Sequence, residues 1–195
     1  MKIIALEESF WYEKLATEGS TVSHVRVKSA VAADWQRKLV DFTEYRLPDM
    51  DRNGVDMQVL SLASPGIQVQ PDPDIAVADA RTANDFLADI IKEHPQRFAG
   101  LAAIPLQDPP KAAAELRRAI ELGLCGALVN DHTLGHYLDE PQYARSGKPC
   151  RTLASRSTSI PTPSPPTTGR SCRDTRRWTR RCGVGPHGPA AMRCG

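Results

Sequence analysis

The residues best placed to do chemistry follow the first apolar segment, KIIAL, where the chain continues with Glu7, Glu8 and Ser9. The short, partly β-branched run predicts a buried strand at 2–6. Because side chains alternate across a strand, we expect Glu7 and Ser9 on one face and Glu8 on the other. A carboxylate two residues from a second coordinating group suits a divalent metal site, whereas the spacing alone fits solvated acids at a strand end equally well.

A second group of polar residues, Asn130, Asp131 and His132, follows a predicted strand at 126–129. In parallel α/β folds the loops at the carboxyl ends of strands hold substrates, so these three residues are candidates for substrate binding. The alternative is a polar loop stabilised by hydrogen bonds between its own side chains and backbone.

The elements that must position these residues alternate between short apolar runs and helical patterns. We predict strands at 2–6, 55–62, 98–104 and 126–129, helices at 34–42, 48–54, 74–94 and 109–122, and a hairpin at 21–28. This alternation indicates a parallel βα architecture, either an open doubly wound sheet or a barrel. No glycine-rich phosphate-binding motif follows any strand, which favours the N-terminal half of a (β/α)8 TIM barrel.

Charge divides the chain near Tyr143. Residues 1–143 hold 14 Lys and Arg and 22 Asp and Glu, a net charge of −8, whereas residues 144–195 hold 11 Lys and Arg and one Asp, a net charge of +10. The second segment is rich in Arg, Pro, Ser and Thr and has no helical or strand period. We therefore predict a partial barrel domain at 1–143 and a disordered basic tail at 144–195.

Three explanations of the tail remain open. The stretch RDTRRWTRR is typical of an arm that binds nucleic acid. Cys172, Cys182, His187 and Cys194 could form a metal tract, although they contain no Cys-x-x-Cys pair. The explanation we favour is an out-of-frame reading that begins near codon 144, because the charge reverses there and Arg, Pro, Gly and Ala are typical of a shifted frame in a GC-rich gene. We accordingly expect no nucleic-acid partner.

The chain has no predicted signal peptide and no apolar run of the roughly 20 residues that a membrane span requires. We therefore expect no membrane partner, a cytoplasmic location and reduced thiols without a disulfide framework.

Four segments carry a resemblance to a known family: KIIALEESFW, GVDMQVLSLASPGIQ, ANDFLADIIKEHPQRFAGLAAIPLQDP and ELGLCGALVNDHT. Together they resemble the amidohydrolase-related metal-dependent decarboxylases, which include the dihydroxybenzoate (resorcylate) decarboxylases and aminocarboxymuconate semialdehyde decarboxylase. The resemblance implies a (β/α)8 barrel with one divalent metal, usually zinc. It also implies non-oxidative decarboxylation of a small aromatic acid, and a homo-oligomer for the intact family member.

In this family the first strand ends in Glu-x-His, and both residues bind the metal. Glu7 matches the glutamate, Ser9 stands in place of the histidine, and nothing after Tyr143 matches the later ligands. The resemblance therefore implies Glu7 as a metal ligand, no catalytic residue in this chain, and a chain inactive in its 195-residue form. Two alternatives remain: hydrolysis of a lactone or similar bond by an amidohydrolase, and a non-catalytic fragment.

Overall fold

The sheet consists of five parallel strands in sequential order. The computed structural model describes residues 2–17, 30–144 and 157–160. The strands are β1 (Ile4–Phe10), β2 (Met57–Leu62), β3 (Phe98–Ala102), β4 (Gly126–Asn130) and β5 (Ser157–Ile160). Each strand pairs in parallel with the next one along the chain. Sequential parallel strands joined by helices form part of a (β/α)8 barrel, so the predicted fold class is confirmed.

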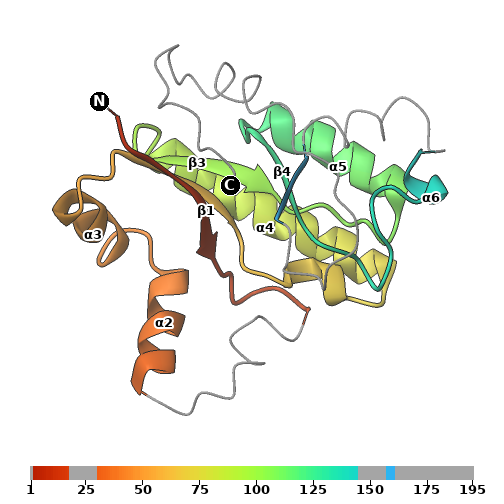
Figure 1. Ribbon diagram of the computed structural model, residues 1–195, viewed down its shortest axis with the longest axis horizontal. Coiled ribbons are helices and arrows are strands. Elements are labelled where there is room, and N and C mark those ends of the chain that lie inside the picture. The colour runs from red at the N-terminus through yellow and green to blue at the C-terminus, as the bar shows by residue number, and fades with distance from the viewer. Residues whose placement is uncertain (1, 18–29, 145–156, 161–195) are drawn as a thin grey trace, which may run out of the picture. The chain divides into compact units, whose positions relative to one another are not determined.

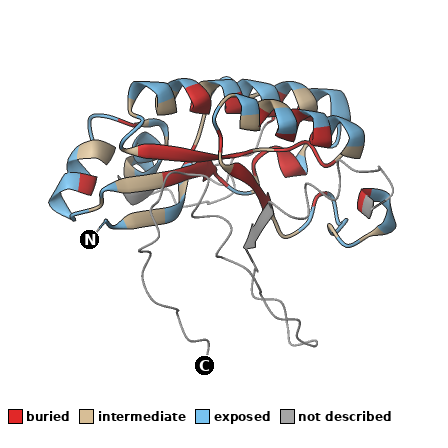
Figure 2. Cartoon of the chain, turned by 90° about the horizontal axis from the view of Figure 1, so that it is seen from above, coloured by how far each residue is buried: buried red, intermediate tan, exposed pale blue. Residues whose placement is uncertain are grey.

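Helices connect the strands and cover one face of the sheet. They are α2 (Ala30–Val40), α3 (Arg46–Arg52), the 3-10 turn η1 (Gly66–Val69), α4 (Pro73–Glu93), α5 (Pro109–Glu121) and α6 (Pro141–Ala144). Figure 1 shows α4 and α5 side by side, and Figure 2 shows the two helices along one face of the sheet, with their buried residues turned toward it. Among the described residues, no helix combines the length and apolar character needed to cross a bilayer.

The two long helices begin where the sequence predicts. The Asp72 carboxylate accepts hydrogen bonds from the N–H groups of Asp74 (2.9 Å) and Ile75, and Pro73 occupies the first helical position. The Asp108 carboxylate likewise accepts from the Lys111 N–H (3.0 Å) ahead of α5. An aspartate followed by proline satisfies exposed backbone donors and presets the helical φ angle.

Close packing between α4 and the sheet requires a glycine in β3. A Cβ atom on Gly100 would lie 2.7 Å from Leu87 Cδ2 and 2.8 Å from Ile91 Cδ1, both on α4. The core is aromatic beside this contact, where the rings of Phe10, Phe42 and Phe86 lie 5.5–6.2 Å apart. The face of β1 that carries Phe10 is therefore the face covered by helices.

Four sequence predictions differ from the structure. The first strand covers 4–10 rather than 2–6. Helix α2 begins at Ala30 rather than at residue 34, so Asp34 lies inside it and forms an ion pair with Lys38 (2.8 Å). Strand β5 lies in the segment for which we predicted no strand. Cys125 is disulfide-bonded, contrary to the expectation of reduced thiols. The predicted hairpin at 21–28 lies outside the described residues, and the other predicted helices and strands agree to within two residues at each end.

Arg46 ties the first strand to the elements beside it. Its guanidinium donates to the Ser9 carbonyl (2.8 Å) and to Gln58 Oε1 (3.1 Å), so it bridges β1 and β2. It also donates to the carbonyls of Lys38 (3.2 Å) and Asp41 (3.1 Å) at the end of α2. Burial lowers the pKa of Arg46, whereas the nearby Glu8 and Asp41 raise it and so favour the charged form.

The Asp41 side chain caps the turn that leads into α3. Its carboxylate accepts from the N–H groups of Glu44 (2.9 Å), Tyr45 (2.9 Å) and Arg46 (3.0 Å). Burial alone would raise the pKa of Asp41, but these backbone donors outweigh burial and leave the pKa below its ordinary 3.8. A carboxylate with a depressed pKa stabilises the fold above its unfolded pKa, and this contribution disappears as the pH falls through the folded value.

We predict that Asp41→Ala lowers the free energy of unfolding at pH 7 by about 1 kcal/mol, because three backbone donors lose their acceptor. The difference from wild type should shrink as the pH falls below 3.8. Urea denaturation at pH 7 and pH 3 measures both effects, with Glu44→Ala as the control because Glu44 contributes only its backbone N–H to this cap. A pH-independent difference would show that the carboxylate charge has no part in the cap.

Candidate active site

The first candidate residue, Glu7, lies inside β1 at a break in the strand pairing. Ala5 pairs with Gln58 and Glu8 with Leu60, so two residues of β1, Leu6 and Glu7, stand opposite one residue of β2. Glu7 has φ +62°, a left-handed conformation that is unfavourable for a residue with a side chain. This β-bulge interrupts the simple alternation that placed Glu7 and Ser9 on one face, and bulges commonly re-aim side chains near active sites.

Regular alternation resumes after the bulge. Ser9 pairs with Ser61 and Phe10 with Leu62, so Ser9 lies on the face away from Phe10 and its helix contacts. Both Glu7 and Ser9 are exposed. Within the described ranges, no three His, Cys, Asp or Glu side chains lie close enough to hold a metal ion. Glu7 therefore supplies one carboxylate, and the described residues do not complete a metal site.

A shallow pocket lies at the carboxyl ends of three adjacent strands, and the space it encloses is about 20 Å³, room for about one water molecule. It is lined by Leu62, Pro65, Gly66, Ile67, Gln68, Ala102, Ala103, Ile104, Leu128 and Asn130. These residues come from the end of β2 and its following loop, the end of β3, and β4. The carboxyl ends of barrel strands are where this fold builds active sites, so the pocket marks one wall of a candidate site, and a ligand larger than water would also occupy the open space beside it.

Gln68 joins the loop after β2 to the loop after β4. Its Oε1 accepts from the Asn130 N–H (2.7 Å), and its Nε2 donates to the carbonyls of Asn130 (2.8 Å) and His132 (2.9 Å). Nε2 also donates to Thr133 Oγ1 (3.1 Å). Gln68 is buried, and this single amide fixes the backbone at the end of β4.

Gln107 makes the corresponding link from the loop after β3. Its Nε2 donates to the carbonyls of Ile67 (2.7 Å) and Gln70 (2.8 Å), on either side of the end of η1. Two glutamine side chains therefore join the loops after β2, β3 and β4 at the edge that carries the pocket.

The three predicted substrate-binding residues occupy different environments. Asn130 lines the pocket, and the described structure gives its side-chain amide no hydrogen bond. Asp131 has φ +47° and does not line the pocket. His132 is exposed, and its Nδ1 accepts a hydrogen bond from the Gly135 N–H (3.1 Å). This contact fits the alternative interpretation, a polar loop stabilised by hydrogen bonds between its own side chains and backbone.

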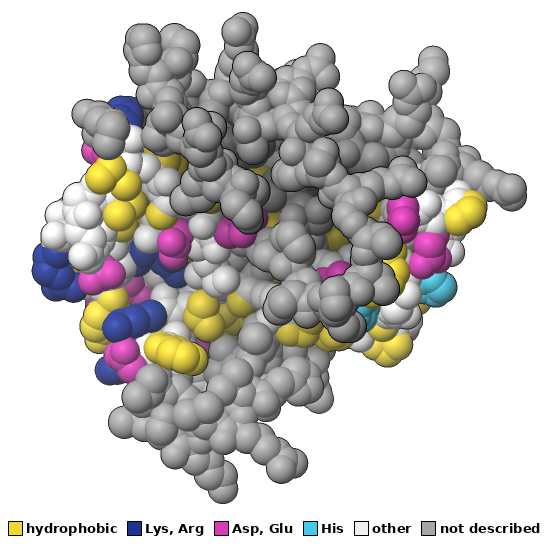
Figure 3. Space-filling model, viewed as in Figure 1, with side chains coloured by type: hydrophobic (Ala, Val, Ile, Leu, Met, Phe, Trp, Pro, Cys, Tyr) yellow, Lys and Arg dark blue, Asp and Glu magenta, His cyan; other side chains and the backbone are white. Residues whose placement is uncertain are grey.

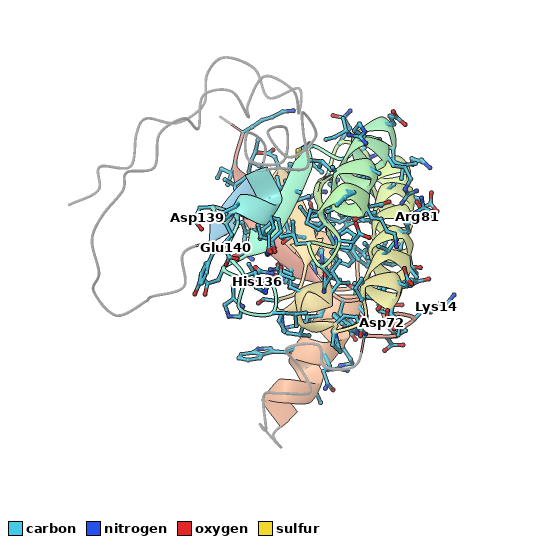
Figure 4. All side chains as sticks on the ribbon, turned by 90° about the vertical axis from the view of Figure 1, so that its right-hand side faces the viewer. Lys14, Asp72, Arg81, His136, Asp139 and Glu140 are labelled. Atoms are coloured by element: carbon cyan, nitrogen blue, oxygen red, sulfur yellow. The ribbon has the colours of Figure 1, made fainter. Side chains whose placement is uncertain are left out.

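The rest of this loop is held by Glu140. Its carboxylate accepts from the Tyr137 N–H (2.8 Å) and lies 2.9 Å from His136 Nδ1. The Tyr137 N–H and, after it, His136 hold the pKa of Glu140 below its ordinary value. Figure 4 shows His136, Asp139 and Glu140 grouped together, at the opposite side of the view from Arg81 of α4.

Gln68, Asn84 and Gln107 are residues of the pocket's surroundings that sequence reasoning missed. Asn84, in α4, holds the backbone of Ala103 beside the pocket. Amides are uncharged and common on surfaces, so composition and spacing give no signal for them. The one available signal was their position, since Gln68 and Gln107 both follow predicted strands.

Comparison with known proteins gives the family. The amidohydrolase family model matches residues 9–155. A gamma-resorcylate decarboxylase of Rhodococcus jostii is 41% identical over 128 residues, which cover 65% of this chain and 38% of that protein.

Two solved structures are similar in both sequence and fold. The dihydroxybenzoic acid decarboxylase of Polaromonas sp. JS666, with bound manganese and the inhibitor 2-nitroresorcinol, aligns with a TM-score of 0.66 and 38% identity over 73% of this chain and 44% of that chain. The 2,6-dihydroxybenzoate decarboxylase from Rhizobium aligns with a TM-score of 0.69 and 33% identity over 95% of this chain and 56% of that chain.

The chain thus spans well under two thirds of the length of these relatives. The matched region contains β2 to β4 together with all the pocket residues. On the family match and the parallel half-barrel together, this chain belongs to the amidohydrolase family.

Proposed function

We propose that this chain carries part of a metal-dependent, non-oxidative decarboxylase of a small aromatic acid such as a dihydroxybenzoate. The observation that carries the proposal is the apolar pocket at the carboxyl ends of β2, β3 and β4. Its lining includes Leu62, Ile67 and Ile104, and no charged side chain of the described residues lines it. Three relatives whose names specify decarboxylation of such acids support this reaction over lactone hydrolysis.

Within this proposal Glu7 is a metal ligand, in the β-bulge of β1. The divalent ion would supply charge stabilisation at the substrate carboxylate. The family resemblance predicts zinc, and the Polaromonas relative binds manganese. Since Ser9 replaces the second ligand and the described residues do not complete a site, we assign no catalytic step to this chain's own metal site.

We propose Asn130 as the pocket's polar contact with the substrate. An amide can both donate to and accept from a phenolic hydroxyl, and both backbone groups of Asn130 are already fixed by Gln68. Asp131 and His132 border this contact as parts of the loop, outside the pocket lining. We further propose a cytoplasmic location and, for an intact family member, a homo-oligomer.

The division of the chain at residue 143 is also a proposal, with an out-of-frame tail from 144 to 195. The reversal of charge supports it. The family match continues to residue 155 and β5 lies at 157–160, so both features favour a boundary later than residue 143. Resequencing the gene past codon 195 and translating all three frames would test it. Resumption of a barrel-like sequence in another frame is the expected result, and uninterrupted confirmation of the present frame would refute it.

We predict that the purified 195-residue chain releases no carbon dioxide from 2,6-dihydroxybenzoate with either Mn²⁺ or Zn²⁺ present. The reason is that the described residues supply one metal ligand and no complete site. A carbon dioxide assay tests this, with a panel of lactones run in parallel. Turnover of the acid would overturn the prediction of inactivity, and turnover of a lactone would favour the hydrolase alternative.

Replacing Ser9 by histidine should raise the affinity for Mn²⁺ and Zn²⁺, because imidazole is a far better ligand than a serine hydroxyl. We expect Ser9→His to bind at least about tenfold more tightly than wild type, as judged by isothermal titration calorimetry, the size of effect that metal-site changes commonly produce. The double variant Ser9→His with Glu7→Gln is the control and should lose the gain. Equal metal affinities in wild type, Ser9→His and the double variant would show that Glu7 does not bind the metal.

Replacing Asn130 by leucine should weaken binding of 2-nitroresorcinol about tenfold through loss of one hydrogen bond, without altering the backbone contacts to Gln68. Ligand-detected NMR titration measures the affinity. Asn53→Leu is the matched control, because Asn53 lies at the end of α3 and, among the residues that the structure describes, its side chain donates a hydrogen bond only to the Asp49 carbonyl. An unchanged affinity in Asn130→Leu would exclude this side chain as the polar contact.

A further inference from the structure

A buried amide of α4 holds the pocket wall where β3 ends. Strand β3 ends at Ala102, and the next residue, Ala103, lies outside the strand ladder. The Ala103 N–H donates to Asn84 Oδ1 (2.9 Å), and Asn84 Nδ2 donates to the Ala103 carbonyl (2.9 Å). The Asn84 side chain thus makes the two backbone hydrogen bonds that a neighbouring strand would otherwise make. Its partner, Ala103, lies 19 residues later in the chain.

The orientation of the Asn84 amide is set by Glu115 of α5. Asn84 Nδ2 also donates to Glu115 Oε1 (2.8 Å), and since a carboxylate only accepts, the nitrogen must face it. Both side chains are almost completely buried, with exposures of 1% for Asn84 and 2% for Glu115. An amide turned the other way would place two oxygen atoms in contact and leave the Ala103 carbonyl without a donor.

Arginines balance the buried charge of Glu115. Arg118 donates through Nε to Glu115 Oε2 (2.9 Å) and through Nη2 to Oε1 (2.7 Å), and Arg81 Nε lies 3.5 Å from Oε2. Arg118 also pairs with Asp85. The hydrogen bonds that Arg118 donates to Glu115, with a further contribution from Asp85, raise the pKa of Arg118, so the guanidinium stays charged throughout the physiological range.

The residue held by Asn84 belongs to the pocket. Ala102, Ala103 and Ile104 are three of its lining residues. We propose that Asn84, oriented by Glu115 and Arg118, is a positioning residue that fixes this wall for the aromatic ligand. The inference rests on the proposed function, because it assigns Asn84 a role in ligand binding beyond joining α4 to α5.

A purely structural role makes a different prediction. If Asn84 serves only to join the two helices, the contact with Glu115 is what matters and the two hydrogen bonds to Ala103 are incidental. If Asn84 positions the wall, the Ala103 contacts decide ligand affinity whatever happens between the helices. Variants that separate these two contacts therefore distinguish the roles.

The experiment uses the full chain and two readouts: hydrogen exchange of the Ala103 amide by NMR, and affinity for 2-nitroresorcinol. In Asn84→Leu, which loses every contact, we expect exchange at Ala103 at least about tenfold faster and affinity about tenfold weaker, the scale of one lost buried hydrogen bond. Thr82→Ala, on the exposed side of α4, should match wild type in both readouts, because within the described part of the chain the Thr82 hydroxyl donates only to the Ala78 carbonyl.

The double variant Asn84→Asp with Glu115→Gln keeps the helix contact and removes one Ala103 contact. The amide that replaces the Glu115 carboxylate can donate to the new carboxylate at position 84, but that new carboxylate cannot donate to the Ala103 carbonyl. We expect its affinity to stay reduced, and recovery to the wild-type value would overturn the positioning role. The same variant serves if Asn84→Leu fails to fold.

The two readouts keep the inference separable from the proposed function. Wild-type protein that does not bind 2-nitroresorcinol would count against the proposed function. Faster exchange at Ala103 in Asn84→Leu would still support the positioning of this residue. Unchanged exchange in that variant would refute the inference even where the ligand binds.

Discussion

The pocket depends on one constraint: where parallel strands end, their backbone N–H and carbonyl groups still need partners. A buried peptide group without a hydrogen bond destabilises a protein by roughly 1–3 kcal/mol. The backbone groups at each strand end that a loop covers therefore need hydrogen-bond partners. This chain meets the requirement with side-chain amides. Gln68 binds both backbone groups of Asn130 at the end of β4, and Asn84 binds both groups of Ala103 after β3.

An amide suits this role because it donates and accepts in the same plane, as a peptide unit does. A carboxylate at either position could only accept, and would leave a carbonyl unpaired. The arrangement also links layers of the fold, since Asn84 belongs to a helix and Gln68 to a loop 62 residues before its partner. The wall of the pocket is consequently hydrogen-bonded to the helix layer behind it.

Much of this fold could be predicted from local sequence. Asp-Pro at the starts of α4 and α5 and short apolar runs for β2, β3 and β4 are local signals, and the elements follow them. The errors arise where distant contacts decide. The bulge at Leu6 and Glu7 extends β1 to Phe10, whose ring packs against Phe42 and Phe86, and β5 forms by pairing with β4 rather than by any period of its own. The sequence pointed to part of the pocket lining and not to the contacts that hold it. Polar residues after strands drew attention to Asn130, which lines the pocket, but Gln68 and Asn84 were missed because their partners lie far away in the sequence.

Family membership and a complete metal site are separate properties, and the described residues show the first without the second. On the parts of the face in Figure 3 that are not grey, hydrophobic side chains lie in small groups among acidic and basic ones, as on an ordinary protein surface. The pocket is distinguished instead by the three strand ends that meet at it. The fold around the pocket depends on apolar strands, on capped helices, and on side-chain amides that bind the backbone at strand ends. These features lie within the matched residues 9–155. Metal binding depends on a few side chains at strand ends, which contribute little to folding. A serine at residue 9 pairs with Ser61 as well as any residue would in the strand ladder. The architecture of the family therefore places no demand on residue 9, and under the proposed function this is the position at which serine replaces a metal ligand.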